Sequence, residues 1–181
     1  MQKEYVLWKY KILKPLVLTG PKLSFRNDEN KRRYKKSWWF RTIRHPKFTK
    51  IYFNFYKTNR YRCGKKIVPE SIAELIDPMA LAIWIMDDGS YSKNKIDIST
   101  YSFTLSEIVL LQKTLYSKFK ILTNFYKDRD KGYRMYCNTV NTQRLIEVIH
   151  PYIISSMLYK IGFHHPVTTS RKVSRELSVT R

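Results

Sequence analysis

An apolar helix that ends on two adjacent carboxylates constrains this chain more than any other feature of its sequence. Residues 81–89 read LAIWIMDDG, and the preceding Asp77 and Pro78 are a favoured capping residue and a favoured first helical residue. The sequence therefore predicts a helix from Pro78 that stops at Gly89 and is apolar on nearly every side, as if packed against another helix. Carboxylates are unfavourable at the negative end of a helix. Such a pair is most often a solvated helix end, but here a divalent cation bound with a DNA phosphate would compensate the charge.

The charge balance indicates the kind of partner. The 181 residues include 35 Lys and Arg against 14 Asp and Glu, and the formal net charge of +21 is not held by a single tail. This charge favours a polyanion, with DNA or RNA first and an anionic membrane surface second. No run approaches the roughly 18 apolar residues of a membrane span, and the first residues do not form a signal-peptide core. We therefore expect a soluble, intracellular protein without a membrane partner.

The remaining composition indicates a folded protein. Hydrophobic residues make up 43% and aromatic residues 15% of the chain, which argues against a disordered basic tail. Cys63 and Cys137 are too few for a disulfide framework or a zinc site, and they suit a reducing compartment. His164 and His165 are given no role.

Hydrophobic periodicity predicts the other elements. Thr104 and Glu107 have the spacing of a capping box at the start of one helix. Helices are predicted at 4–13, 47–57, 71–76, 78–88, 105–119 and 142–153. Strands are predicted at 22–26, 37–45 and 95–103, with a hairpin over 123–138 that turns at 130–132. The polar run 27–36 predicts an exposed basic loop.

The two halves of the chain repeat one order of elements: helix, strand pair, helix, then a loop with a lysine. EYVLWKYKIL corresponds to EIVLLQKTLY, SWWFRTI to GYRMYCN, and GKKIVPE to SMLYKIG. The second half has an acidic helix and a strand in front of this unit, and the first half has neither. The sequence predicts an incomplete first repeat over 1–76, a second repeat over 77–163 and a basic tail over 164–181.

These segments together resemble a known family. LAIWIMDDG is similar to the motif of the LAGLIDADG homing endonucleases, and the resemblance runs from QKEYVLWKYKIL through GKKIVPE, DPMALAIWIMDDG and STYSFT to PYIISSMLYKI. It is closest to the intron-encoded, single-chain members. The resemblance implies an α+β fold of two αββαββα repeats, in which two motif helices pack side by side and curved antiparallel sheets form a DNA-binding saddle.

The resemblance also implies the site residues. Asp88 takes the position of the metal-binding carboxylate, and Gly89 closes the helix beside it, so both are assigned to the metal. Lys66 and Lys160 match the lysines that polarise each catalytic centre, although a surface lysine bound to any phosphate is the plain alternative. The implied cofactor is Mg²⁺, with Mn²⁺ as a substitute.

One element of the family is not found. Single-chain members have two motif helices and this sequence shows one, so the other is expected before Met1, through a truncated gene, a late start codon or a trimmed chain. A homodimer with one motif per chain is the alternative. Ile83 replaces the glycine of the third motif position, which leaves Ala80 and Ala82 as the small residues for a helix contact. The complete form is expected to be a monomer, and self-association through the uncovered face is expected for this form.

Strand alternation selects the residues that would face DNA, although solvated sheet positions are the ordinary interpretation of such a face. The predicted set is Lys95, Asp97, Ser99, Arg134, Tyr136 and Asn138 in the second half, and Lys22, Ser24, Arg26, Trp39 and Arg41 in the first. Arg32 and Arg33 in the basic loop are expected to contact the DNA backbone. Neutralising both should weaken binding evenly across sequences and flatten its salt dependence, as a filter-binding titration would measure.

Two functions follow. The first is a site-specific, Mg²⁺-dependent DNA endonuclease for intron homing that leaves 3′ overhangs. The alternative is a maturase that binds intron RNA, or a catalytically incomplete DNA-binding fragment. The abundance of Lys, Ile, Tyr and Phe indicates an AT-rich genome, as in a mitochondrion, a chloroplast or some bacteria.

Overall fold

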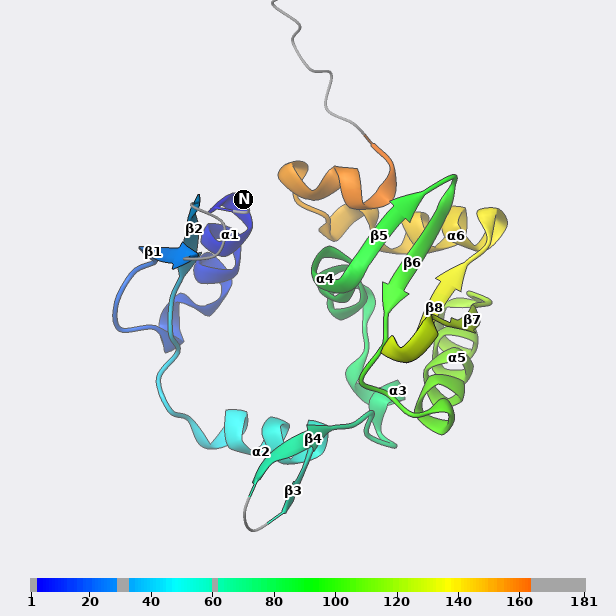
Figure 1. Cartoon of the computed structure of the whole chain (residues 1–181), viewed down its shortest axis with the longest axis horizontal. Helices are drawn as coiled ribbons and strands as arrows, with labels where there is room; N and C mark the ends of the chain where they lie inside the picture. The colour runs from blue at the N-terminus through cyan, green and yellow to red at the C-terminus, as the bar shows by residue number, and fades with distance from the viewer. Residues whose placement is uncertain (1–2, 29–32, 60–61, 164–181) are drawn as a thin grey trace, which may run out of the picture.

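Helices and short strands alternate along the chain in the computed structural model, which describes residues 3–28, 33–59 and 62–163 (Figure 1). The helices are α1 (Lys3–Leu13), α2 (Pro46–Phe55), α3 (Ile72–Leu75), α4 (Pro78–Asp88), α5 (Leu105–Phe119) and α6 (Thr139–Ile149). The strands are β1 (Lys22–Asp28), β2 (Arg33–Trp39), β3 (Tyr56–Asn59), β4 (Arg62–Lys66), β5 (Gly89–Ser92), β6 (Lys95–Ser99), β7 (Asn124–Lys127) and β8 (Tyr133–Cys137). The 3₁₀ helices are η1 (Lys14–Leu16), η2 (Arg129–Lys131), η3 (His150–Tyr152) and η4 (Ser155–Ile161).

The largest sheet has four antiparallel strands in the order β5-β6-β8-β7. From α4 to α6 the elements follow the order αββαββα, and the predicted α+β class with antiparallel sheets is confirmed. In the described part of the first half, β1–β2 and β3–β4 instead form separate two-stranded sheets. Among the side chains described there, none on these four strands is buried, so no shared core joins the two hairpins.

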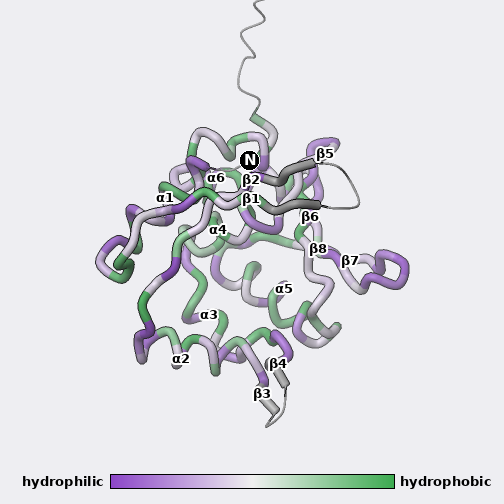
Figure 2. Tube along the Cα trace, turned by 60° about the vertical axis from the view of Figure 1, so that its left-hand side comes forward, coloured by the Kyte–Doolittle hydropathy of each residue, from purple (hydrophilic) through white to green (hydrophobic). Residues whose placement is uncertain are grey.

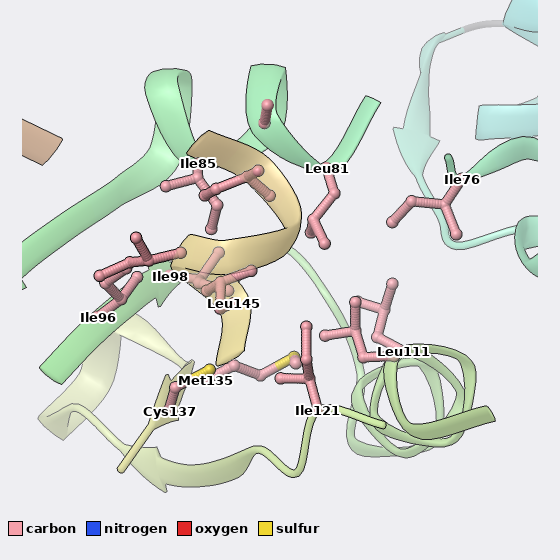
Figure 3. Close-up of a cluster of buried hydrophobic side chains, with 14 of the residues drawn as sticks. Ile76, Leu81, Ile85, Ile96, Ile98, Leu111, Ile121, Met135, Cys137 and Leu145 are labelled. Carbon is pink, nitrogen blue, oxygen red and sulfur yellow. The ribbon is translucent and has the colours of Figure 1, made fainter. Parts of the chain in front are cut away.

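The main core lies between the four-stranded sheet and the helices that cover one of its faces. Figure 3 shows the side chains of β6 and β8 directed at those of α4, α5 and α6. Each fully buried side chain of this size stabilises the fold by about 1.5–3 kcal/mol. The cluster includes Ile96, Ile98, Met135 and Cys137 from the sheet and Leu81, Ile85, Leu111 and Leu145 from the helices.

The helix α4 is also buried on a second side. Met86 packs with Tyr5 of α1 and Met157 of η4, and all three are at most 2% exposed. In Figure 1, α4 accordingly lies between α1 and the four-stranded sheet. Contacts on both sides explain why this helix is apolar almost all round.

The first hairpin extends further than its side chains indicate. The run 27–36 predicts a loop, but antiparallel pairing continues from Lys22 opposite Trp39 to Asp28 opposite Arg33. The prediction is therefore wrong for the strand residues at both ends of the run. Ladder hydrogen bonds join backbone groups, so charged side chains do not prevent them.

The second strand of this hairpin ends earlier than predicted. The run 37–45 predicts a strand, but β2 stops at Trp39, opposite the first residue of β1, Lys22. Beyond that pair β1 provides no backbone partner. Phe40 turns instead to Tyr10 of α1, with an edge-on contact of 5.8 Å between ring centroids.

Three other boundaries differ from the prediction. The run 64–70 predicts a loop, but its first residues complete β4, which pairs with β3. Gly89 ends α4 and also begins β5, a strand that periodicity does not reveal because GSYS is short and polar. The helix α6 begins at Thr139 rather than at residue 142, because the side chain of Asn138 accepts a hydrogen bond from the Asn141 amide.

The amphipathic pattern predicted for 47–57 is present in α2, where Phe55 packs against the main core but other apolar residues stay exposed. Figure 2 shows α2 alternating between hydrophobic and hydrophilic positions, in contrast to the uniformly hydrophilic turn between β7 and β8. Ile51 is 52% exposed and Phe53 is 60% exposed. Exposed apolar residues grouped in this way are suited to a contact with another surface.

Glu107 connects the start of α5 to the segment after β4. Its carboxylate accepts hydrogen bonds from the Thr104 amide at 2.6 Å and from the Val68 amide at 3.1 Å, and the predicted capping box is confirmed. Burial alone opposes ionisation of Glu107, but the hydrogen bonds from Thr104 and Val68 outweigh it and lower its pKa.

We predict that Glu107→Gln weakens the acid dependence of stability. Because the folded pKa lies below the unfolded one, the carboxylate stabilises the fold above its ordinary pKa of 4.5, and this contribution is lost as the pH falls through the folded pKa. Urea unfolding should therefore separate wild type from variant at about pH 7 and bring them together at about pH 3. Glu147→Gln on α6 is the control, and an equal effect of both changes would contradict the prediction.

Candidate active site and nucleic-acid interface

The motif helix α4 is fixed at both ends by local interactions. At its start, the Asp77 side chain accepts a hydrogen bond from the Ala80 amide at 2.7 Å. At its end, Gly89 has an extended backbone (φ −78°, ψ 153°), and its amide donates to the Ile85 carbonyl. A Cβ atom on Gly89 would lie 2.5 Å from that carbonyl oxygen. Glycine is required here by this close approach, and not by a left-handed conformation.

The Asp87 carboxylate is bound by a lysine of α1. Lys9 Nζ donates to both of its oxygens, at 3.0 and 3.1 Å. The same ammonium lies 4.0 Å from the centre of the Tyr5 ring. Burial raises the pKa of the Tyr5 hydroxyl, and the charges of Asp87 and Asp88 raise it further. The lysine therefore compensates one of the two charges at the negative end of the helix.

The Asp88 carboxylate is exposed. Within residues 3–28, 33–59 and 62–163 it has no hydrogen bond or ion pair. The two aspartates thus differ in availability, because Asp87 has a fixed cation and Asp88 has none.

Lys160 contacts Gly89, the residue that follows Asp88. Its ammonium donates to the Gly89 carbonyl oxygen at 2.7 Å, so the lysine interacts with the C-terminal end of α4. The helix η4 that carries it ends at Gly162, where φ is +88° and an added Cβ would meet the Tyr91 ring at 2.4 Å. This close packing of η4 against β5 places Lys160 at the C-terminal end of the motif helix α4.

Lys66 lies elsewhere. Its ammonium is 5.5 Å from the centre of the Phe103 ring. With Ala80 and Trp84 of α4 it lines a cavity of about 210 Å³. The structure therefore brings Lys160 to the end of α4 and places Lys66 beside the earlier turns of the same helix.

The donor groups at this end of α4 fit part of a magnesium site. The described residues include no cluster of three or more His, Cys, Asp or Glu side chains that could hold a metal. Mg²⁺ usually keeps several waters and binds one or two carboxylates together with substrate phosphates. The unpaired Asp88 fits that role. Gly89 fits it poorly, because its carbonyl oxygen already accepts the Lys160 ammonium.

The outer face of the four-stranded sheet has the alternation predicted from the sequence. Along β6, Ile96 and Ile98 are buried, whereas Lys95, Asp97 and Ser99 are not. In β8 the same alternation leaves two predicted residues on the outer face, Arg134 and Tyr136. Asn138 lies outside β8, and its carboxamide oxygen caps α6. That oxygen is therefore already engaged within the protein.

Arg134 is the centre of a polar network on this face. Its guanidinium donates to the Tyr101 hydroxyl and to the Ser90 hydroxyl, each at 3.2 Å, and its Nε lies 3.9 Å from Asp97. Tyr126 in turn donates to Asp97 at 3.1 Å. Burial opposes the charge of Arg134, but the hydrogen bond with Tyr101 and the nearby acidic groups raise its pKa.

We predict that Arg134→Lys lowers the free energy of unfolding by about 1–2 kcal/mol. A lysine keeps the positive charge, but it lacks the planar guanidinium with which Arg134 donates to two hydroxyl groups at once. Urea denaturation would measure the change. Arg41→Lys is the control because Arg41 is exposed and stacks on Trp39 alone, at 5.2 Å. Equal losses in the two variants would show that the network contributes nothing specific.

Two neighbouring strands add residues that sequence analysis did not select. Ser90 pairs with Asp97 across β5 and β6, and Asn124 and Tyr126 pair with Tyr136 and Arg134 across β7 and β8. Ser90, Asn124 and Tyr126 therefore share the outer face. The hairpin over 123–138 was the available signal for the β7 residues, whereas β5 gave none.

The first hairpin has a comparable set of exposed residues. Pairing of Lys22 with Trp39 and of Ser24 with Ser37 puts Lys22, Ser24 and Trp39 on one face. The two serine hydroxyls are 2.9 Å apart. Arg26 and Arg33 are strand residues whose side chains lie outside the description, and Arg32 lies outside it entirely.

The fold and this site define the class of protein. The fold matches that of a solved homing endonuclease. A solved structure, the homing endonuclease I-WcaI bound to its DNA recognition sequence, superposes with a TM-score of 0.79 over 91% of this chain and 73% of that chain, at 23% identity.

The family follows from the sequence comparison. Residues 1–145 match the model of the LAGLIDADG DNA endonuclease family, and the chain belongs to this family. The resemblance drawn from LAIWIMDDG is therefore confirmed.

Some curated relatives are named as endonucleases and others as maturases. The cytochrome b mRNA maturase bI2 of Debaryomyces hansenii is 33% identical over 163 residues, which cover 88% of this chain and 60% of that protein. The intron-encoded endonuclease ai4 of Dictyostelium discoideum is 38% identical over 127 residues, or 68% of this chain and 76% of that protein. The DNA endonuclease I-ChuI of Chlamydomonas applanata is 32% identical over 170 residues, or 87% and 78%.

The described helices lack the features of a helix that crosses a bilayer. None of them, over residues 3–28, 33–59 and 62–163, combines the length and hydrophobicity of a membrane span.

Proposed function

We propose that this chain acts in intron homing as a site-specific endonuclease on double-stranded DNA. The observation that carries the proposal is the unpaired Asp88 carboxylate at the end of the motif helix, beside Lys160 and next to the exposed face of the sheet. The relatives named as endonucleases support the same reaction class. The proposed reaction is hydrolysis of one phosphodiester bond in each strand, leaving 3′ overhangs.

The roles of the residues follow from their positions. Asp88 would hold Mg²⁺, or Mn²⁺ in its place, together with phosphate oxygens of the DNA. The bound metal would supply charge neutralisation and lower the pKa of the attacking water. Lys160, whose ammonium donates to the Gly89 carbonyl oxygen, would orient water near the phosphate. Lys66 keeps its predicted role as the lysine of the other repeat, and Gly89 contributes by closing the helix.

The exposed sheet faces would bind the major groove of the DNA. In this proposal Lys95 contacts phosphates, and Tyr136 contacts base edges or sugar. The network around Arg134 holds its guanidinium in a fixed direction, as base recognition requires. The first hairpin would contribute phosphate contacts of its own. The remaining predicted contacts are Ser24, Arg26, Arg32, Arg33, Trp39, Arg41, Asp97, Ser99 and Asn138.

The proposed function extends to the repeats of the chain, its oligomeric state and its location. We propose residues 1–76 and 77–163 as two repeats of unequal completeness, followed by the basic segment 164–181. The exposed apolar residues of α2 favour self-association of this form, and the complete form is proposed to be a monomer. An organelle or a bacterial cytoplasm is the proposed location, since several relatives are named as intron-encoded.

The first experiment is a cleavage assay on supercoiled plasmid that carries the intron-lacking allele of the host gene. With Mg²⁺ and the full chain, linear product with 3′ overhangs is expected, and chelation by EDTA should stop it. Nicking alone would indicate one active centre. No cleavage of this plasmid, despite tight binding to it, would contradict the endonuclease proposal for this form.

A second candidate is an RNA-binding role in splicing. A relative named as an mRNA maturase matches 88% of this chain, and the net charge of +21 suits RNA as well as DNA. The two candidates differ in their need for the carboxylate. If the chain binds intron RNA and assists splicing equally well with Asp88→Asn, the maturase role is supported and a metal-dependent one is not.

A further inference from the structure

The two aspartates at the end of α4 are adjacent in sequence but have different surroundings. Asp87 has a side chain that is 44% exposed, yet both of its oxygens accept hydrogen bonds from Lys9. Asp88 is exposed and has no such partner among the described residues. The family motif assigns the metal to Asp88, but the sequence gives no physical reason why the adjacent Asp87 carboxylate should not bind the same cation.

Lys9 is held in place by its own neighbours. The ammonium contacts both the Asp87 carboxylate and the Tyr5 ring, 4.0 Å from the ring centre. Tyr5 is 2% exposed, stacks on Trp8 at 5.9 Å, and directs its hydroxyl to the Ile83 carbonyl at 3.5 Å. A cation that contacts both an aromatic ring and a carboxylate is stabilised by each of them. The position of Lys9 therefore depends on a buried ring and not on a mobile surface group.

We propose that Lys9 is a positioning residue that keeps Asp87 out of the metal site and so makes Asp88 the carboxylate that meets the cation. This inference rests on the proposed function. Without Lys9, two neighbouring carboxylates would be free to turn towards one ion, and Mg²⁺ or Mn²⁺ would bind both. With Lys9 in place, the ion keeps open positions for water and phosphate, as a catalytic site requires.

A plain structural role for the Lys9–Asp87 pair makes a different prediction. An ion pair that only fastens α1 to α4 would change the free energy of unfolding when it is removed, and it would leave metal affinity alone. A positioning role changes which carboxylates bind the metal. Metal affinity therefore separates the two, with no need for cleavage activity.

The test is a titration of the full 181-residue chain with Mn²⁺, followed by electron paramagnetic resonance of the free ion. Lys9→Gln should tighten Mn²⁺ binding about tenfold, because a second carboxylate joins the first. Adding Asp87→Asn to it should return the affinity to that of wild type, and Lys9→Arg should keep it there. Lys11→Gln makes the same charge change on the same helix and should alter affinity less than about twofold.

The single substitutions at the aspartates complete the test. Asp87→Asn should leave Mn²⁺ affinity within about twofold of wild type, and Asp88→Asn should lower it about tenfold or more. The proposal is overturned if Lys9→Gln acts no differently from Lys11→Gln, or if Asp87→Asn weakens binding as Asp88→Asn does. Weaker Mn²⁺ binding by Asp87→Asn would overturn the proposal even if Lys9→Gln does not fold.

Failure of the proposed function would have another signature. If Asp88→Asn bound Mn²⁺ as tightly as wild type, Asp88 would not be the metal ligand that the proposed nuclease requires. The comparison of Lys9→Gln with and without Asp87→Asn would still report on Lys9 alone.

Discussion

The substitution Asp88→Asn is expected to reduce DNA cleavage by about 10³-fold or more. A metal at the scissile phosphate contributes several kcal/mol of transition-state stabilisation, and each 1.4 kcal/mol corresponds to a factor of ten in rate. Asparagine is nearly isosteric but does not carry the charge that attracts the ion. Because Asp88 has no hydrogen bond or ion pair among the described residues, the fold should lose little when it is replaced.

The matched control is Asp87→Asn, one residue earlier on the same helix. Both variants remove one negative charge near the DNA, so general effects on affinity are shared. The control should retain cleavage within about tenfold of wild type, since Asp87 is already paired with Lys9. Supercoiled plasmid and Mg²⁺ provide the assay, with circular dichroism to confirm folding. Equal loss in both variants, or full activity of Asp88→Asn, would show that Asp88 is not the metal ligand.

The second large effect is expected from Gly89→Ala. The new methyl group would lie 2.5 Å from the Ile85 carbonyl oxygen and 2.9 Å from Ile85 Cγ2, both far inside contact distance. Either the last turn of α4 opens or β5 moves away from its partner. Overpacking of this kind costs about 1–3 kcal/mol, and we expect the upper end of that range because a backbone atom is involved.

Urea denaturation would measure this loss, and Gly20→Ala is its control. Among the described residues, a Cβ on Gly20 would meet only the Tyr10 hydroxyl, at 4.0 Å, so a change of less than about 0.5 kcal/mol is expected there. The same Gly89 variant should also cleave more slowly, since any shift of the last turn moves Asp88. A Gly89→Ala protein as stable as wild type would mean that the close approach is readily relieved.

Much of the fold could be predicted because its signals are local. Asp77 and Pro78 mark the start of the motif helix, and Thr104 and Glu107 mark the start of α5, each through contacts within a few residues. The alternation of apolar and polar residues likewise predicted which side chains lie on the outer face of β6. The strand β5 could not be found in this way, because GSYS becomes a strand only through pairing with β6.

The candidate site likewise contains residues with a local sequence signal and residues without one. Asp88 was predicted from the motif and Lys160 from its surrounding sequence, and the structure brings both to the end of α4. The partner of Asp87 could not be chosen from 35 basic residues, because Lys9 lies 78 positions away in the sequence. Asn138 has a structural role that its predicted place in a hairpin did not indicate. Its side chain suits a base contact, but the helix that follows uses it as a cap.

The end of α4 is completed by cations from opposite ends of the described chain. Lys9 reaches it across 78 residues of sequence and Lys160 across 71. Contacts this distant form slowly, because the intervening chain must be ordered first. During synthesis, the two aspartates would emerge long before Lys160 is available. We therefore expect the candidate active site to be among the last features to form. An unfinished chain would not yet have the complete site of the proposed nuclease.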